Sequence, residues 1–377
     1  MTTPSGSHYL AACALLAAAV IARVDASDYA DSFRFSSAPA AARFPHAQVS
    51  HQSLDGVKAD SVVAADGSGQ YKTVQEAINA APQETSADRR WLIRIKPGTY
   101  HELVYAQREK RFVMLVGDDP ATTTITYDLK AGDLGPDRKP IGTFRTPSVV
   151  IDADDFSAEN LTFENAAGPN GQALAVRVDG DRVVFRNCRF LGWQDTIFLD
   201  RGRQYFEDSL ITGHVDFIFG GATAWFERCR IHIWRNGYIT AAATPREAPY
   251  GFVFARGRIT GAPDALTYLG RPWRPFAQTT FLETDMSAAV RPEGWHNWDK
   301  PDREGTVRYG EAGSTGPGGQ TDRRVSWAKR LTAAEVKAIT VTAVLGGTDR
   351  WDPASVPAHP STVRALDVPL PEPPGPR

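Results

Sequence analysis

A short pattern that begins with phenylalanine recurs six times in the middle of the chain. Its copies start at Phe156, Phe185, Phe206, Phe226, Phe254 and Phe281. The starts lie 29, 21, 20, 28 and 27 residues apart, and each copy ends five positions later on an apolar residue. A period in the twenties with strand-like composition is typical of a solenoid whose coils stack strand on strand. We therefore predict an all-β fold, a right-handed parallel β-helix, with a sandwich of short strands as the alternative.

Two segments that flank the repeats are predicted to be helices. TVQEAINAAP begins with Thr73 and Glu76 in the spacing of a capping box, and TAAEVKAI repeats that spacing with Thr332 and Glu335. We expect these short helices to cap the two ends of the stack. Sealed ends would leave no strand edge exposed to pair with another chain.

The two ends of the chain differ in composition from the repeats. Residues 1–26 contain the apolar run YLAACALLAAAVIA, which is too short to span a bilayer, and are interpreted as a signal peptide, with an uncleaved anchor as the alternative. Residues 27–56 lack periodicity and form an N-terminal arm, residues 57–351 hold the β-helix, and residues 352–377 form a proline-rich extended tail. We expect a secreted or periplasmic protein.

The charge balance excludes two classes of partner. The chain carries 42 Lys and Arg against 44 Asp and Glu, a formal net charge of −2, and has no long basic run. This composition argues against nucleic acid, and against a membrane surface once the signal is cleaved. Nine Trp and eleven Tyr suit the apolar faces of sugar rings, although core packing explains many of them equally well. We expect a monomer.

The repeat register also predicts the state of two cysteines. Cys188, Ser209 and Cys229 occupy the fourth position of three successive copies, so a serine separates the cysteines. At about 4.8 Å per strand, two coils place their Cα atoms about 9.6 Å apart, beyond the roughly 7 Å limit for a disulfide. We predict two free, buried thiols despite export.

Two aspartates share one register. Asp195 lies ten residues after Phe185, and Asp216 lies ten residues after Phe206, so we expect them on adjacent coils, about one strand spacing apart. Because two charges that close cannot both ionise cheaply, one pKa should be raised and the other held down, which separates an acid from a base or nucleophile. Aspartates that cap turns, or a stacked polar ladder, are the alternative.

An arginine further along the chain completes this group. Arg271 lies in YLGRPWRPF, two residues before Trp273. An arginine that reaches one aspartate would keep it ionised and fix its rotamer, whereas a solvated surface guanidinium is the alternative.

Several blocks resemble the ordered signatures of the pectin methylesterase (pectinesterase) family. They are DGSGQYKTVQEAINAAP at 66–82, GTYHE at 98–102, GQALAV at 171–176, GWQDT at 192–196, GHVDFIFG at 213–220 and LGRPW at 269–273. The resemblance implies a right-handed parallel β-helix that hydrolyses galacturonosyl methyl esters in pectin to pectate and methanol. It also indicates a stand-alone, bacterial-type enzyme, because no inhibitor-like domain precedes the blocks.

The resemblance also implies a role for each matched residue. Asp216 is similar to the family's nucleophile, and Asp195 to its general acid and base. Gln172 and Gln194 match the donors to the oxyanion, and Arg271 matches the arginine that orients the nucleophile. Substrate contacts are implied for Gln172, Arg271, Trp273, Thr143, Phe198, Val215 and Phe219.

Other functions remain open from the residues alone. A β-helical glycoside hydrolase acting on polygalacturonate would also use two close carboxylates. A same-fold esterase or thioesterase acting on another acyl substrate, or a non-catalytic carbohydrate-binding β-helix, are further alternatives. The chain has no G-x-S-x-G elbow and no Cys/His cluster, so we predict no serine triad, no metal site and no cofactor. The acidic run DADD at 152–155 is read as a turn rather than as a calcium site.

Overall fold

The computed structural model describes residues 58–359 and 361–375. The predicted signal peptide, residues 1–26, and the predicted arm, residues 27–56, therefore lie outside the described residues. None of the helices formed by the described residues has the length and apolar character needed to cross a bilayer.

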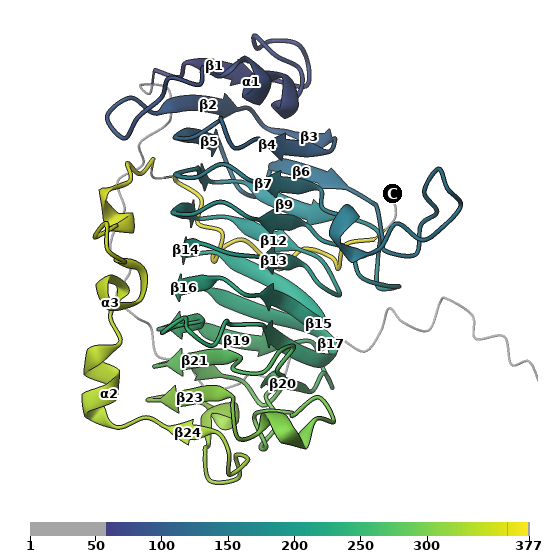
Figure 1. Ribbon diagram of the computed structural model, residues 1–377. Coiled ribbons are helices and arrows are strands. Elements are labelled where there is room, and N and C mark those ends of the chain that lie inside the picture. The colour runs from purple at the N-terminus through teal and green to yellow at the C-terminus, as the bar shows by residue number, and fades with distance from the viewer. Residues whose placement is uncertain (1–57, 360, 376–377) are drawn as a thin grey trace, which may run out of the picture. The chain divides into compact units, whose positions relative to one another are not determined.

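One sheet of eleven strands runs the length of the repeat region, and neighbouring strands pair in parallel (Figure 1). In sheet order its strands are β1 (Ser61–Val63), β2 (Trp91–Ile95), β5 (Val113–Gly117), β8 (Ser157–Glu159), β11 (Val183–Arg186), β14 (Arg203–Glu207), β16 (Thr223–Glu227), β18 (Phe252–Ala255), β21 (Gln278–Leu282), β23 (Arg308–Ala312) and β24 (Lys329–Arg330).

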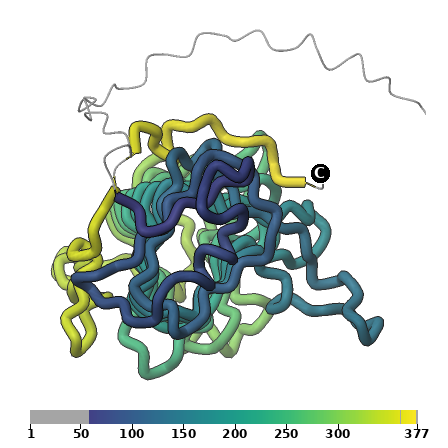
Figure 2. Tube along the Cα trace, turned by 90° about the horizontal axis from the view of Figure 1, so that it is seen from above, coloured from purple at the N-terminus to yellow at the C-terminus, as the bar shows by residue number. Residues whose placement is uncertain are grey.

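A second sheet of thirteen strands forms the remaining two faces of each coil. One face holds β3 (Gly98–His101), β6 (Thr123–Tyr127), β9 (Thr162–Asn165), β12 (Arg189–Leu191), β19 (Arg258–Gly261) and β22 (Asp285–Met286). The other holds β4 (Val104–Ala106), β7 (Val149–Ile151), β10 (Val176–Val178), β13 (Ile197–Leu199) and β20 (Thr267–Gly270). Two long strands, β15 (Leu210–Gly220) and β17 (Arg230–Ala242), belong to both faces. The fold is the predicted right-handed parallel β-helix, whose coils superpose in the view along the stack (Figure 2).

Five of the six predicted phenylalanine positions stack directly on one another. Phe185, Phe206, Phe226, Phe254 and Phe281 are successive partners in the ladder of the first sheet. Their ring centroids lie 4.3 to 4.8 Å apart, in stacked geometry. The sixth position was wrong, because Ala158 and not Phe156 pairs with Phe185.

This phenylalanine ladder predicts a large loss of stability when it is broken. Phe226 lies between Phe206 and Phe254 and is fully buried. Phe226→Ala should lower the free energy of unfolding by about 3–5 kcal/mol, since both the apolar burial and the ring contacts are lost. Urea unfolding followed by circular dichroism measures the effect. Leu103→Ala, at a side chain that is 46% exposed, is the control and should change stability by less than about 0.5 kcal/mol. A loss as small in Phe226→Ala would contradict the ladder's role.

Both predicted helices are present, but only one caps the stack. Helix α1 (Val74–Ala80) has the predicted capping box and buries Val74, Ala77 and Ile78 at the N-terminal end, beside β1, β2 and β4. Helix α2 (Ala333–Ala338) also has its capping box. Together with α3 (Val341–Leu345) it lies along the outer side of the first sheet rather than over the end (Figure 1). The prediction that α2 closes the stack is therefore wrong.

The outer side of the first sheet explains where α2 and α3 pack. Val184, Trp225 and Val253 point outward from this sheet and are buried together with Val344 and Leu345 of α3. Because these outward side chains are apolar, the C-terminal helices stabilise the fold by covering them.

The remaining helices of residues 58–359 and 361–375 are short 3₁₀ turns in the connections: η2 (Thr143–Arg145), η3 (Pro301–Arg303), η4 (Pro317–Gly319) and η5 (Pro353–Ser355). The two cysteines are free and buried, as predicted, and the backbone N–H of Cys188 donates to Ser209 Oγ of the intervening coil. Burial raises the pKa of both thiols, which keeps them unreactive.

Candidate active site

The predicted catalytic residues lie at the corner between the two faces of the second sheet. Strands β12 and β13 belong to one coil, and the long strand β15 belongs to the next. β12 pairs with the first part of β15, and β13 pairs with its last part. Residues 192–196 connect β12 to β13 and turn this corner, and residues 213–216 do the same within β15 through a register irregularity.

Asp195 and Asp216 occupy equivalent places on adjacent coils, as the register predicted. Ile197 pairs with Ile218, and each aspartate lies two residues before its member of that pair. Both aspartates have a left-handed backbone, with φ of 64° and 50°. Aspartate tolerates this conformation better than most residues do.

Arg271 contacts only one of the two carboxyl groups. Its Nε and Nη2 donate to the two carboxylate oxygens of Asp216 at 2.9 and 2.7 Å, so that the pair is bidentate. Burial raises the pKa of Asp216, and the Arg271 guanidinium opposes that increase. The pKa of Asp195 is raised well above its usual range by burial and by the negative charge of Asp216.

These shifts correct one detail of the sequence prediction. The pKa of Asp216 is not held below its usual value, because its burial outweighs the effect of the guanidinium. The order of the two groups nevertheless follows the prediction, since the group that lacks the arginine is the more strongly raised. Asp216 therefore ionises first, and Asp195 keeps the shared proton.

Two aromatic rings hold the Arg271 side chain from both sides. Its guanidinium carbon lies 3.8 Å from the ring centroid of Tyr238 and 3.7 Å from that of Trp298. Planar guanidinium groups stack well on aromatic faces, so both contacts fix the direction in which Arg271 donates. The sequence prediction did not include Tyr238 or Trp298.

Gln172 and Gln194 lie beside the two carboxyl groups. They form an isolated parallel bridge between adjacent coils, and both line a cavity of about 340 Å³ together with Asp195, Asp216 and Arg271. Among the described residues, neither side-chain amide has a hydrogen-bond partner. Both amides are therefore available to donate to an oxygen atom of a bound molecule.

The walls of this cavity match most of the predicted substrate contacts. Thr143, Trp273 and Phe219 line it. Phe198 does not, since it is buried beneath the wall and stacks on Phe219 at a centroid distance of 4.7 Å. Val215 is also absent from the lining; it pairs with Tyr238 in the adjacent coil.

Three lining residues were missed from the sequence. Phe144, 44% exposed, extends the wall beyond Thr143, and its ring lies 6.4 Å from that of Trp273. Ala241 and Trp298 complete the lining. Phe144 directly follows Thr143, which was a predicted substrate contact. That adjacency was the one feature of the sequence that could have indicated Phe144 as a lining residue. Trp298 lies in an irregular segment where no periodicity could place it.

The arrangement combines the groups that acyl transfer requires. A carboxylate oriented by an arginine can attack a carbonyl carbon, and a protonated carboxyl group on the next coil can supply a proton to the leaving oxygen. The two amides can stabilise an oxyanion. Two close carboxyl groups would also suit a retaining glycosidase, so geometry alone leaves two reaction classes.

Comparison with known sequences identifies relatives of this chain. A sequence model of the family described as Pectinesterase matches residues 60–348. Pectinesterase 31 of Arabidopsis thaliana is 42% identical over 276 residues, which is 71% of this chain and 86% of that protein. Putative pectinesterase/pectinesterase inhibitor 38 of the same plant is 39% identical, and the match covers 72% of this chain but 59% of that longer protein. These plant relatives lend no support to a bacterial type.

Solved structures agree with the sequence match. A pectin methylesterase from carrot superposes with a TM-score of 0.74 at 35% identity, covering 81% of this chain and 98% of that one. A pectin methylesterase in complex with hexasaccharide VII superposes with a TM-score of 0.68 at 29% identity, covering 78% and 98% of the two chains.

Proposed function

The chain belongs to the pectinesterase family, and on that premise we propose how it hydrolyses the methyl esters of pectin to methanol and pectate, with Asp216 and Asp195 as the reacting groups. One observation carries the assignment of roles: Arg271 donates two hydrogen bonds to one of the two stacked carboxyl groups, Asp216, and none to Asp195. The cavity that holds the pair also contains two free amides and an aromatic wall.

In the first step, the Asp216 carboxylate attacks the ester carbonyl carbon of a galacturonate methyl ester. Arg271 directs the attacking oxygen and keeps Asp216 ionised. The tetrahedral intermediate collapses when its bond to the methoxy oxygen breaks, and Asp195 donates its proton to that oxygen. Methanol leaves, and Asp216 carries the galacturonosyl group as an anhydride.

In the second step, Asp195 acts as a base. Now ionised, it takes a proton from a water molecule that attacks the galacturonosyl carbonyl carbon. The bond to Asp216 breaks, galacturonic acid is released and loses its carboxyl proton to the solvent, and the proton on Asp195 restores the starting state. One water molecule is consumed and one methanol is formed for each ester.

The two glutamines are proposed to bind the oxyanion in both steps. Gln172 and Gln194 come from adjacent coils and have no other partner among the described side chains. Gln172→Ala and Gln194→Ala should each lower kcat by about 10² to 10³, because one oxyanion donor is lost in the transition state. Initial rates of methanol release measure the effect. A change confined to KM would instead assign these amides to ground-state binding.

The aromatic wall is proposed to bind the sugar. Trp273, Phe219 and Phe144 line the cavity, and flat apolar rings pack well against pyranose faces. Because a polymer of this size cannot cross a membrane, the enzyme must meet it outside the cytoplasm. We propose a secreted or periplasmic location on that ground; the predicted signal peptide lies outside the described residues.

One assay separates this function from its alternatives. Methanol and new reducing ends should be counted in the same digest of methylated polygalacturonate. The proposal expects methanol without new reducing ends. New reducing ends without methanol would indicate the glycoside hydrolase, and neither product would leave a different acyl substrate or a binding protein. A thioester substrate tested in parallel distinguishes those last two.

A further inference from the structure

The segment that follows the family match lies across the outside of the β-helix. The match to the pectinesterase family ends at residue 348. Beyond it, residues 349–359 and 361–375, here called the C-terminal strap, run from the first sheet toward the face that holds β6, β9 and β12 (Figures 1 and 2). Apart from the turn η5 the strap has no regular structure, so side-chain contacts must hold it.

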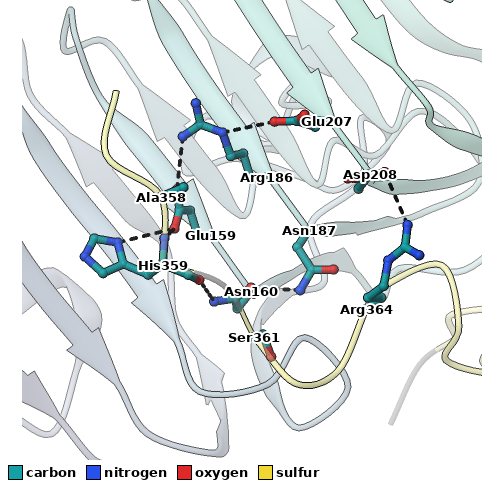
Figure 3. A pocket seen from close by; sticks show the side chains of 10 residues that line it. All are labelled: Glu159, Asn160, Arg186, Asn187, Glu207, Asp208, Ala358, His359, Ser361 and Arg364. Atoms are coloured by element: carbon teal, nitrogen blue, oxygen red, sulfur yellow. Dashed lines mark hydrogen bonds and ion pairs between the residues drawn. The ribbon is translucent and has the colours of Figure 1, made fainter. Parts of the chain in front are cut away.

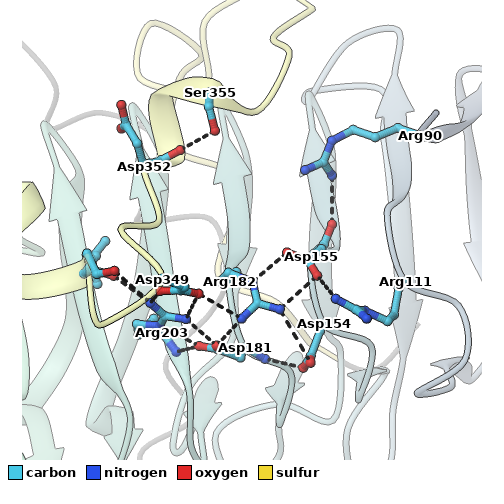
Figure 4. Close-up of polar contacts among 12 residues, drawn as sticks. Arg90, Arg111, Asp154, Asp155, Asp181, Arg182, Arg203, Asp349, Asp352 and Ser355 are labelled. Atoms are coloured by element: carbon cyan, nitrogen blue, oxygen red, sulfur yellow. Dashed lines mark hydrogen bonds and ion pairs between the residues drawn. The ribbon is translucent and has the colours of Figure 1, made fainter. Parts of the chain in front are cut away.

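An ion-pair cluster fixes the beginning of the strap. Asp349 accepts from Arg203 at 2.6 and 2.9 Å and lies 3.3 Å from Arg182 (Figure 4). Arg182 also contacts Asp154 and Asp155, the acidic run that was read as a turn. Arg203 lowers the pKa of Asp349, which keeps this carboxylate charged.

A buried glutamate fixes the middle of the strap. Glu159, 1% exposed, accepts from the His359 backbone N–H at 2.6 Å and pairs with Arg186 at 3.1 Å (Figure 3). Arg186 Nη2 also donates to the Pro353 carbonyl at 2.6 Å. A buried carboxylate is stable only when it is paired in this way, so the strap completes the coordination of Glu159.

Two asparagines at the turns of adjacent coils bind the strap next. Asn160 Nδ2 donates to the His359 carbonyl at 3.0 Å (Figure 3). Asn187 Nδ2 donates to the Val363 carbonyl at 2.8 Å. The Ala365 backbone N–H donates to Asn187 Oδ1 at 2.6 Å, and Ala365 is fully buried.

The far end of the strap reaches the catalytic corner. Residues 371–375 lie over β6, β9 and β12, with a cavity of about 420 Å³ beneath them. The indole N–H of Trp193 donates to the carbonyl of Pro374. Trp193 is 7% exposed, and it immediately precedes Gln194 and Asp195 in the chain.

Trp193 is also fixed on its other sides. The Arg235 guanidinium lies 4.8 Å from its ring centroid, and the His214 ring meets it edge to face at 5.5 Å. Its backbone carbonyl accepts from the His214 N–H at 2.9 Å, two residues before Asp216. The tryptophan therefore joins the strap to the corners of both coils that carry the carboxyl groups.

We propose that the C-terminal strap is a positioning element for the ester hydrolysis described above, and that it acts by holding Trp193 and, through it, the backbone at Gln194 and Asp195. Misplacement of a reacting group by about 1 Å can cost up to about 10²-fold in rate. A residue held in the left-handed region, as Asp195 is, depends on its surroundings to stay there.

Two variants test this inference, which rests on the proposed function. A chain that ends after Pro369 removes the acceptor but keeps the earlier anchors, and Trp193→Phe removes the N–H donor together with part of the ring that packs against Arg235 and His214. Each should lower kcat about tenfold and leave KM within about twofold. The alkaline limb of the pH-rate profile should also move to lower pH, because water that enters a loosened corner relieves the burial that raises the pKa of Asp195. The combined variant should cost no more than Trp193→Phe alone, since the hydrogen bond that the shortened chain loses is already absent in Trp193→Phe.

Trp234→Phe is the matched control. Its ring packs against that of Trp193 at a centroid distance of 6.4 Å, and its indole N–H has no partner among the described residues. Trp234→Phe therefore removes a similar ring volume at the same place without breaking the hydrogen bond to the strap, and its kcat and pH profile should not change. Wild-type kcat and pH profile in the shortened chain and in Trp193→Phe would overturn the inference, as would losses that multiply in the combined variant. If the shortened chain does not fold, Trp193→Phe decides alone. A wild type that releases no methanol would instead refute the proposed function.

Discussion

Asp216→Asn is expected to lower the rate of methanol release by about 10⁴-fold or more, the scale on which removal of an attacking group acts in other enzymes. The amide has almost the same size as the carboxylate but is not nucleophilic. It also cannot accept both hydrogen bonds from Arg271, which donates at 2.9 and 2.7 Å. Initial rates on methylated polygalacturonate measure the loss.

Asp208→Asn is a closely matched control for this substitution. Asp208 also has a left-handed backbone, with φ of 49°, and also accepts two hydrogen bonds from an arginine, Arg228, both at 3.0 Å. It lies outside the cavity that holds Asp216. The control should retain activity within about twofold. An equal loss in both variants would show that the effect comes from a broken ion pair, and would contradict the nucleophile assignment.

Asp195→Asn is expected to change activity and stability in opposite directions. The variant has no proton for the leaving methoxide and no base for the water, so kcat should fall by about 10² to 10⁴. Its stability at neutral pH should exceed that of the wild type, because burial and the charge of Asp216 both disfavour an ionised Asp195.

The sign of the stability change follows from proton binding. The folded state raises the pKa of Asp195, so above about pH 4 the unfolded chain releases this proton while the folded protein retains it. Wild-type stability therefore falls as pH rises from there to the folded pKa, and the variant lacks this loss. Thermal unfolding at several pH values should show an advantage for Asp195→Asn at neutral pH that disappears below about pH 4. An advantage that grows toward low pH would contradict the shift.

The register of the repeats was enough to predict that Asp195 and Asp216 stack on adjacent coils. Because neighbouring parallel strands keep their alignment, ten residues after each of Phe185 and Phe206 leads to equivalent places on adjacent coils. The same reasoning predicted two free cysteines. It failed at Phe156, where a phenylalanine that is also buried imitates the pattern two residues early.

The residue with a left-handed backbone at the turn that follows β8 and β11 gives the correct alignment of these two coils. Asn160 and Asn187 both have a positive φ, and the amide of one donates to the other at 2.8 Å. Each asparagine lies two residues after its member of the Ala158–Phe185 pair, so this turn marks the register that Phe156 misses.

Features outside the repeats could not be placed from the sequence. The capping box predicted that α2 exists, but an amphipathic helix packs on whichever apolar surface is available, here the outer side of the first sheet. Trp298 and the C-terminal strap lie in irregular segments, whose courses depend on contacts with residues far away in the chain. The cation–π contacts of Arg271 and the anchor on Trp193 therefore needed the structure.

The central claim is that, of the two stacked carboxyl groups, Asp195 holds the proton and Asp216 holds the charge. Neutron diffraction of the wild-type protein, which locates deuterons, would test this claim directly. At the pH where methanol release is fastest, the account predicts a deuteron on the carboxyl group of Asp195 and none on Asp216. A deuteron on Asp216, or on neither group, would contradict the roles assigned here.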